Sequence, residues 1–119
     1  SRVRTMSAPE AAWMGAMIEG EGSIEALRVR PDGYLRARVC ITNTSVEVMS
    51  TCLRFAGDGT LGYENPNARR PRLRAGKNKV CWAWYLSNRD SIRVFLPQVI
   101  PYLCDKQEKA CFLLSQLTE

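Results

Sequence analysis

The stretch from Trp13 to Ile24, W-M-G-A-M-I-E-G-E-G-S-I, constrains the fold of this 119-residue chain more than any other. Six apolar or small residues are followed by two carboxylates, Glu19 and Glu21, and each carboxylate is followed by a glycine. A mid-helix glycine costs about 1 kcal/mol relative to alanine, so Gly15 makes sense if another helix packs very close to it. The G-E-G ending lets the backbone turn sharply. We therefore predict a helix that makes an intimate helix–helix contact and presents Glu21 at its foot, where a strand begins.

Hydrophobic periodicity and turn signals predict one α+β domain over residues 1–119. Ser7 and Glu10 form a capping box with Pro9 in the first turn, so a helix begins there. Residues 1–6 are basic and are expected to form a mobile leader. The expected elements are helices over 7–20, 45–56, 91–96 and 106–117 and strands over 23–30, 34–42, 60–64 and 80–87.

Further helix starts carry capping residues of the same kind. Thr44 with Glu47 matches a second capping box. Either Asn88 or Asp90 is expected to cap the third helix, and Asp105 the last one. These caps divide the chain into a helix, two strands, a helix, two strands and final helices.

The strand over 34–42 alternates cleanly, with apolar residues on one face and arginines on the other. The apolar face carries Leu35, Ala37, Val39 and Ile41, and the opposite face carries Tyr34, Arg36, Arg38 and Cys40. In the strand over 23–30 the alternation does not decide which face is inward. In the fourth strand we place Trp82 and Trp84 in the core and Tyr85 on the arginine face. A base-stacking platform made of the tryptophans is the alternative.

The charge is unevenly placed. The chain has 17 basic and 12 acidic residues, a formal net charge of +5 and a pI of about 9.2. The segment 65–79 contains six cations and no acid, namely Arg69, Arg70, Arg72, Arg74, Lys77 and Lys79. A solvated loop is one interpretation. The functional one is an arm that contacts phosphates, because each neutralised phosphate releases counterions.

The five cysteines have no CxxC spacing, and the chain has no histidine. This composition argues against a zinc site, a disulfide framework and histidine-based catalysis. We expect the cysteines to be small apolar or semi-buried residues in an intracellular, reducing compartment. No run is apolar and long enough to span a membrane, and no signal peptide is visible. The arginine bias suggests a bacterial or phage gene, hence a cytoplasmic protein.

Residues 14–22, M-G-A-M-I-E-G-E-G, resemble the nine-letter motif of the LAGLIDADG homing endonucleases. Methionine replaces both leucines, glycine and alanine are exchanged, and glutamate replaces both aspartates. The segment 41–44, I-T-N-T, is similar to the family's stretch that carries a polar active-site residue. The segment 101–106, P-Y-L-C-D-K, is similar to its P-aromatic-L-x-x-K segment.

The resemblance implies an α-β-β-α-β-β-α LAGLIDADG unit, with a curved antiparallel four-stranded sheet and helices packed on one face. One motif per chain implies a homodimer, because cutting two DNA strands needs two sites. The implied interface at the two-fold axis comprises Trp13, Met14, Gly15, Ala16, Met17 and Ile18.

The resemblance also implies site-specific, metal-dependent cleavage of double-stranded DNA at a near-palindromic target, leaving short 3′ overhangs. Glu21 and the backbone carbonyl of Gly20 would hold Mg²⁺, which prefers oxygen ligands. Mn²⁺ would substitute, and Ca²⁺ would support binding without cleavage. Lys106 would stabilise transition-state charge or help activate the water, and Asn43 would position that water. Glu19 is expected to serve the helix terminus or to be solvated.

The implied sheet would lie in the major groove, where arginines can read guanine. The candidate DNA-binding residues are Arg28, Arg30, Arg36, Arg38 and Tyr85, together with Arg69, Arg70, Arg72, Arg74, Lys77 and Lys79. Glu47 departs from the pattern, because some members of the family carry a basic residue there.

Two other functions are compatible with the sequence. The same scaffold could bind nucleic acid without cutting it, as an intron RNA maturase or a DNA-binding regulator, and RNA would then become a partner. A small basic structural protein is the third interpretation. Loss of cleavage with retained binding in a Glu21→Gln variant would separate the first function from the second.

Overall fold

The computed structural model describes residues 1–28, 31, 33–64 and 80–118. The elements are α1 (Ala8–Glu21), β1 (Gly22–Arg28), β2 (Leu35–Asn43), α2 (Val46–Ala56), β3 (Thr60–Glu64), β4 (Cys81–Leu86), α4 (Arg89–Val99), the 3₁₀ helix η1 (Ile100–Tyr102) and α5 (Gln107–Leu117). The predicted order of helices and strands is confirmed. The candidate DNA-binding residues Arg30, Arg69, Arg70, Arg72, Arg74, Lys77 and Lys79 lie outside the described residues.

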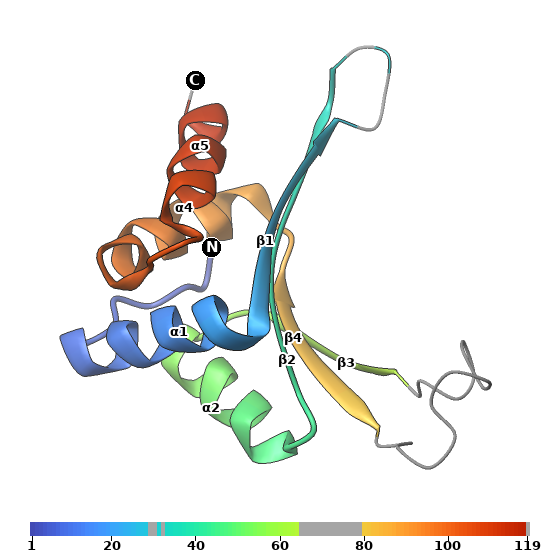
Figure 1. Ribbon diagram of the computed structural model, residues 1–119, viewed down its shortest axis with the longest axis vertical. Helices are drawn as coiled ribbons and strands as arrows, with labels where there is room; N and C mark the ends of the chain where they lie inside the picture. Colours follow the sequence, from blue (N-terminus) through green and yellow to red (C-terminus); the bar gives the residue numbers. More distant parts are fainter. Residues whose placement is uncertain (29–30, 32, 65–79, 119) are drawn as a thin grey trace.

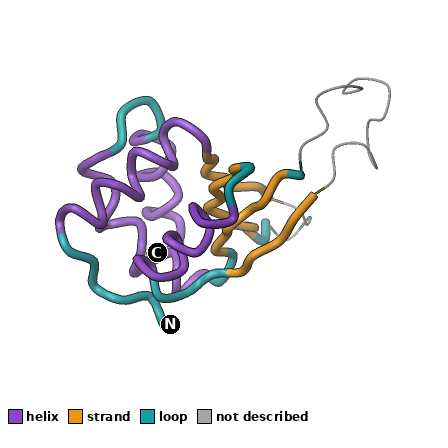
Figure 2. Tube along the Cα trace, turned by 90° about the horizontal axis from the view of Figure 1, so that it is seen from below, coloured by secondary structure: helices purple, strands orange, loops and turns teal. Residues whose placement is uncertain are grey.

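The four strands form one antiparallel sheet in the order β1-β2-β4-β3. Figure 1 shows the strands curving past the helices, which all lie on one side of the sheet. Figure 2, turned by 90°, shows the same separation of helices from strands. The predicted α+β architecture is therefore confirmed, and the other face of the sheet is left uncovered by the described elements.

The register of β1 on β2 settles the facing that the sequence left open. Ile24 pairs with Val39, and Glu25 pairs with Arg38. Because paired residues point to the same side of a sheet, Ile24 is in the core and Glu25 is on the open face. Ile24 is 2% exposed, which agrees with this assignment.

The core lies between α1, α2, α4 and the covered face of the sheet. Met14 and Ile18 of α1 meet Val39 and Ile41 of β2 in one buried apolar cluster. Trp84 is fully buried and its ring centroid lies 5.5 Å from that of Phe95. Trp84 is therefore a core residue, as predicted, and not a stacking platform.

Trp82 lies on the same face of β4 as Trp84 but is less buried. It is only half-buried, and its ring lies 5.4 Å from that of the exposed Tyr63. The pair sits where β3 and β4 extend towards the end of the hairpin. The prediction that both tryptophans are core residues therefore holds in full only for Trp84.

The capping box of α1 is confirmed, with Ser7 Oγ accepting from Glu10 N and Glu10 Oε1 accepting from Ser7 N. The second predicted capping box is wrong. Ser45 is the N-cap of α2, and no side chain of Thr44 or Glu47 caps the helix. Asn43 Oδ1 accepts from Ser45 N instead, so the last residue of β2 fixes the start of α2.

The third helix is longer than predicted. Asn88 is its N-cap and accepts from Ser91 N, but the helix runs to Val99 rather than ending at Leu96. Pro97 lies inside its last turns. A proline inside a helix removes one backbone hydrogen bond and crowds the preceding turn, which costs stability. Burial of Val99 beyond it offsets that cost, so the helix continues past Pro97.

The expected mobile leader is wrong, because residues 4–6 are anchored. Arg4 N donates to Ala56 O at 2.9 Å, and Met6 N donates to Gln98 Oε1 at 2.7 Å. Met6 itself is buried. These long-range contacts hold the N-terminal segment against α2 and α4.

All five cysteines are free thiols, and the expected burial holds for Cys40 and Cys52 and in part for Cys81, whereas Cys104 and Cys111 are exposed. Burial raises the pKa of the Cys52 thiol to about 12, which makes it inert at neutral pH. Within the described part of the chain, no helix combines the length and the apolarity that a membrane crossing requires.

One face of α1 packs into the core of its own chain. Met14 and Ile18 have no exposed surface, and Gly15 is also buried. A Cβ at Gly15 would lie 2.8 Å from Tyr102 Cβ and 3.4 Å from Val99 O. The close contact predicted at Gly15 is thus real, but its partner is η1 of the same chain. Met14, Gly15 and Ile18 are therefore corrected from interface residues to core residues.

Gly15→Ala should destabilise the protein by about 1–3 kcal/mol, because the new methyl group must push η1 away from α1. Gly62→Ala in β3 is the control, since its added Cβ would meet only Tyr85 Cε1 at 3.9 Å, an ordinary van der Waals distance. Urea unfolding at equal protein concentrations measures both changes. Equal stabilities for the two variants would contradict the close approach of Tyr102.

Candidate active site at the foot of helix α1

The site begins where α1 passes into β1 without a loop. Gly22 caps the helix and opens the strand. A Cβ at Gly22 would lie 2.9 Å from Ile18 Cα and would also collide with the Cys40 carbonyl oxygen. Only glycine fits this crossing, and it leaves the exposed Glu21 at the foot of the helix, as predicted.

Asn43 lies directly beside Glu21. Asn43 Nδ2 donates to Glu21 Oε2 at 2.7 Å, while its Oδ1 accepts from Ser45 N at 2.8 Å. Thr42 Oγ1 donates to Glu21 O at 3.2 Å. The end of β2 therefore fixes both the backbone and one carboxylate oxygen of Glu21.

Glu19 points the other way, to the turn before α5. Its carboxylate accepts from the backbone N–H groups of Cys104 at 2.7 Å, Asp105 at 3.1 Å and Lys106 at 3.2 Å. The Cys104 hydrogen bond is the main reason that the pKa of Glu19 lies below its ordinary value of 4.5. Glu19 thus binds the N–H groups of the turn just before α5. The N-cap of α5 is Lys106 and no side chain caps it, so the predicted Asp105 cap is wrong.

Lys106 is held to the same helix end. Its Nζ donates to the backbone carbonyl oxygen of Glu19 at 2.6 Å. A lysine at this position satisfies one of the last carbonyl groups of α1 and is favoured by the helix dipole. The structure thus brings the three predicted catalytic residues to one helix terminus. Asn43 contacts Glu21 directly, and Lys106 contacts Glu19 two residues away.

The donor set suits a hard divalent cation. Glu21 offers a carboxylate and Gly20 an adjacent backbone carbonyl, both exposed at the helix end. Among the described residues no group of three or more His, Cys, Asp or Glu side chains gathers around one point. One chain therefore supplies only a few oxygen ligands. Mg²⁺ tolerates such a set, since it retains waters and binds substrate phosphates.

The open face of the sheet carries the two predicted sheet arginines. The Arg38 guanidinium carbon lies 4.3 Å from the centroid of the Tyr85 ring, and Arg38 Nη2 lies 4.0 Å from Cys40 Sγ. Arg38 Nε is shielded from water and has no hydrogen-bond partner among the residues that the structure describes. Arg36 is exposed, and no hydrogen bond or ion pair joins its side chain to another residue in the described part of the chain. Tyr85 therefore shares the arginine face, as predicted.

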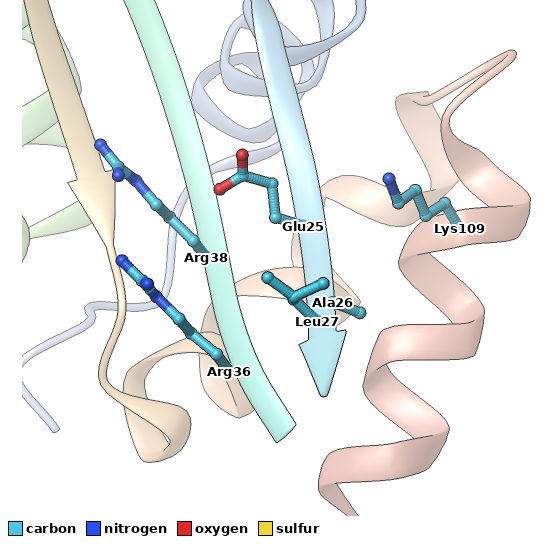
Figure 3. A pocket seen from close by; sticks show the side chains of 6 residues that line it. All are labelled: Glu25, Ala26, Leu27, Arg36, Arg38 and Lys109. Carbon is cyan, nitrogen blue, oxygen red and sulfur yellow. The ribbon is translucent and has the colours of Figure 1, made fainter. Parts of the chain in front are cut away.

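A shallow hollow crosses this face and the free edge of β1. Figure 3 shows its lining, with Arg36 and Arg38 extending side by side from β2 and Lys109 approaching from α5 beyond the edge of β1. Glu25 projects on the arginine side. The lining residues are Glu25, Ala26, Leu27, Arg36, Arg38 and Lys109.

The structure separates Arg28 from the other sheet candidates. Arg28 pairs with Leu35 and so lies on the covered side, where its Nη2 donates to Gln116 Oε1 of α5 at 2.7 Å. Its Nη1 donates to Gly33 O. Arg28 ties the β1–β2 hairpin to α5, whereas the open face belongs to Arg36 and Arg38.

The outer face of α1 keeps surface that the core does not bury. Ala16 and Gly20 are exposed, and Trp13 and Met17 are half-buried. The Trp13 ring packs edge-to-face against Phe55 of α2, with ring centroids 5.3 Å apart. Of the six residues that the sequence analysis assigned to a dimer interface, only Trp13, Ala16 and Met17 keep exposed surface.

Two residues near the site were missed by the sequence analysis. Glu25 stands directly across from Arg38, and Thr42 binds the Glu21 carbonyl. The alternation of β1 places Glu25 on the same face as Ser23 and Leu27. The sequence does not say which face that is, because the facing depends on how β1 pairs with β2. No local pattern marks Thr42.

Asn43→Ala should lower the free energy of unfolding by about 1–2 kcal/mol, because it removes the acceptor that fixes the start of α2. Thr44→Ala is the matched control and should stay within about 0.5 kcal/mol, since Thr44 is exposed and caps nothing. Chemical unfolding of both variants tests this. A loss at Thr44 with none at Asn43 would restore the capping box that the sequence suggested.

No protein-family model matches the chain, and no curated protein sequence matches it significantly. Solved structures do. The homing endonuclease I-CvuI, in complex with its target in the presence of Ca, superposes with a TM-score of 0.73 at 17% identity, covering 93% of this chain and 67% of that one. The intron-encoded homing endonuclease I-CeuI, complexed with DNA, gives 0.68 at 16% identity, covering 97% and 56%. The archaeal I-Vdi141I, also complexed with DNA, gives 0.65 at 17% identity, covering 92% and 67%.

The chain thus spans between about half and two thirds of the length of these proteins. The superposed part includes nearly all of the elements described above. At this level of identity the likeness concerns the arrangement of helices and strands. The chain has the fold of the LAGLIDADG homing endonucleases.

Proposed function

We propose that this protein is a site-specific double-strand DNA endonuclease that acts as a homodimer with a divalent metal. The observation that carries the proposal is the placement of Glu21 and Asn43 at the foot of α1, 2.7 Å apart, on a fold shared with homing endonucleases solved on DNA. The uncovered arginine face of the same sheet supports DNA as the substrate. A near-palindromic target follows from the two-fold symmetry of a homodimer.

Glu21 and the Gly20 carbonyl would hold the metal. When bound, Mg²⁺ polarises the phosphate and stabilises the leaving oxygen. Asn43 restrains one Glu21 oxygen and leaves the other available. Lys106 supplies a positive charge close to the same helix end, where it can stabilise the charge that builds on the phosphate. Mn²⁺ should replace Mg²⁺, and Ca²⁺ should support binding alone.

Arg36 and Arg38 are proposed to face the major groove. A bidentate arginine contact to guanine contributes roughly 1–3 kcal/mol of discrimination. Tyr85 supports the Arg38 guanidinium from one side, so less side-chain entropy is lost when Arg38 binds. Arg28 is better assigned to holding the hairpin against α5 than to base contacts.

The dimer proposal rests on the outer face of α1. Ala12, Trp13, Ala16, Met17 and Gly20 recur at helical spacing along that face and include no charge. Small residues at Ala16 and Gly20 let a second helix approach closely. Two chains joined there would bring two Glu21 residues together, one for each DNA strand.

The first test presents purified protein with a randomised double-stranded DNA library in Mg²⁺ and, in parallel, in Ca²⁺. We expect one near-palindromic sequence to be cut in Mg²⁺, leaving short 3′ overhangs, and only bound in Ca²⁺. Glu21→Gln should abolish cleavage and preserve binding, because it removes the metal-binding charge. Glu108→Gln, on the exposed side of α5, is the charge-matched control and should cut normally.

The library also separates the alternatives. A sequence that is enriched but never cut in either metal would contradict the nuclease proposal and favour a DNA-binding regulator. No enrichment from DNA, with binding to structured RNA, would favour a maturase. In both cases Glu21→Gln would leave binding unchanged.

Ala16→Arg should convert the dimer to a monomer, because a charged side chain cannot be buried between two α1 helices without a partner. Val94→Arg is the control, since Val94 is also exposed but lies on α4. Light scattering coupled to size-exclusion chromatography measures both. A wild-type protein that is monomeric at micromolar concentration, or a dimer that survives Ala16→Arg, would contradict the proposed interface.

A further inference from the structure

Glu19 is the most heavily hydrogen-bonded side chain near the site, yet it faces away from Glu21's partners. Its carboxylate receives three backbone N–H groups in succession, and one of them belongs to Lys106. The backbone carbonyl oxygen of Glu19 also accepts a hydrogen bond from Lys106 Nζ. Glu19 therefore binds Lys106 at both its backbone and its side chain.

This double attachment fixes where Lys106 can be. The turn 103–106 connects η1 to α5, and Leu103 is its buried residue. The N–H groups at 104–106 precede the helix and have no carbonyl partner within it, so the Glu19 carboxylate replaces water as their acceptor. Since carboxylates bind backbone N–H groups strongly, this contact sets the position of the turn relative to α1.

We infer that Glu19 is a positioning residue, which holds Lys106 at the foot of α1 so that its charge lies beside Glu21. The catalytic part of this inference rests on the proposed endonuclease function. The two glutamates then have different roles. Glu21 takes part in the reaction, and Glu19 holds the turn that carries the Lys106 ammonium group. The Glu19 side chain is half-buried, and its three backbone contacts all go to that segment.

The chain offers a control for simple loosening of the same turn. Gln107 Nε2 donates to Ile100 O at 2.8 Å and so ties the first turn of α5 to η1. Gln107→Ala removes that tie and leaves every Glu19 contact in place. A role limited to stabilising the turn would make Glu19 and Gln107 variants behave alike.

The first measurement needs no DNA. Native protein is acylated with a water-soluble lysine reagent, and the rates at Lys106 and Lys109 are read by peptide mass spectrometry. Lys109 is exposed one turn further along α5 and serves as the internal reference. We expect slow modification of Lys106 in the wild type, a severalfold faster rate in Glu19→Ala and a smaller increase in Glu19→Gln, with Lys109 unchanged. An unchanged Lys106 rate in both variants would overturn the inference.

The second measurement is a double-mutant cycle on single-turnover cleavage of the selected target. Lys106→Met should slow cleavage about 100-fold, as for loss of a charge-stabilising donor. Glu19→Ala should slow it at least about 10-fold through misplacement of Lys106. In the Lys106→Met background, Glu19→Ala should cause no further loss, whereas Gln107→Ala should leave the wild-type rate nearly unchanged.

Additive effects of Glu19→Ala and Lys106→Met would show that Glu19 acts independently of Lys106, and would overturn the inference. Glu19→Gln guards against a variant that fails to fold, because its amide oxygen still accepts from the turn. A wild-type protein that cuts no DNA would overturn the proposed nuclease function. The acylation rates would then still decide whether Glu19 positions Lys106.

Discussion

The close approach of α1 to its own chain is the constraint on which the rest of the structure depends. At Gly15 the helix meets Tyr102 of η1, and at Gly22 it passes into the sheet against the backbone of β2. Each contact leaves no room for a Cβ. Between them, the rotation of α1 about its axis is fixed. Glu19 and Glu21 lie two residues apart, so a fixed rotation sends their side chains to different neighbours.

The distribution of charge follows from that geometry. The helix foot carries Glu21, while the open sheet face beyond it carries Arg36 and Arg38. Arg38 is held by the Tyr85 ring, an attraction of about 0.5–1 kcal/mol at an exposed site. Its shielded Nε forgoes a hydrogen bond, which is a cost. The Tyr85 ring and the shielding of Nε together restrict the positions that the Arg38 guanidinium can take on the open face.

What the sequence could predict was local. The Ser7–Glu10 box and the alternation of β2 depend on residues a few positions apart, and both were confirmed. The facing of β1 depends on its pairing with β2, so Glu25 could not be placed. The anchored N-terminal segment depends on Ala56 and Gln98, about 50 and 90 residues away. Gly15 was assigned a close contact for the right reason, but composition alone could not tell an internal partner from a second copy.

The departure from the family motif at Glu21 is best understood together with Asn43. Relative to aspartate, glutamate adds one methylene and one rotatable bond, which cost side-chain entropy when the carboxylate is fixed. The hydrogen bond from Asn43 Nδ2 restricts that freedom within the protein itself. Asn43 is itself fixed by Ser45 N, so its orientation comes from the start of α2 and not from the site. Asn43 therefore fixes the Glu21 carboxylate. The position of Asn43 between the end of β2 and the start of α2 determines how far that carboxylate extends from the helix.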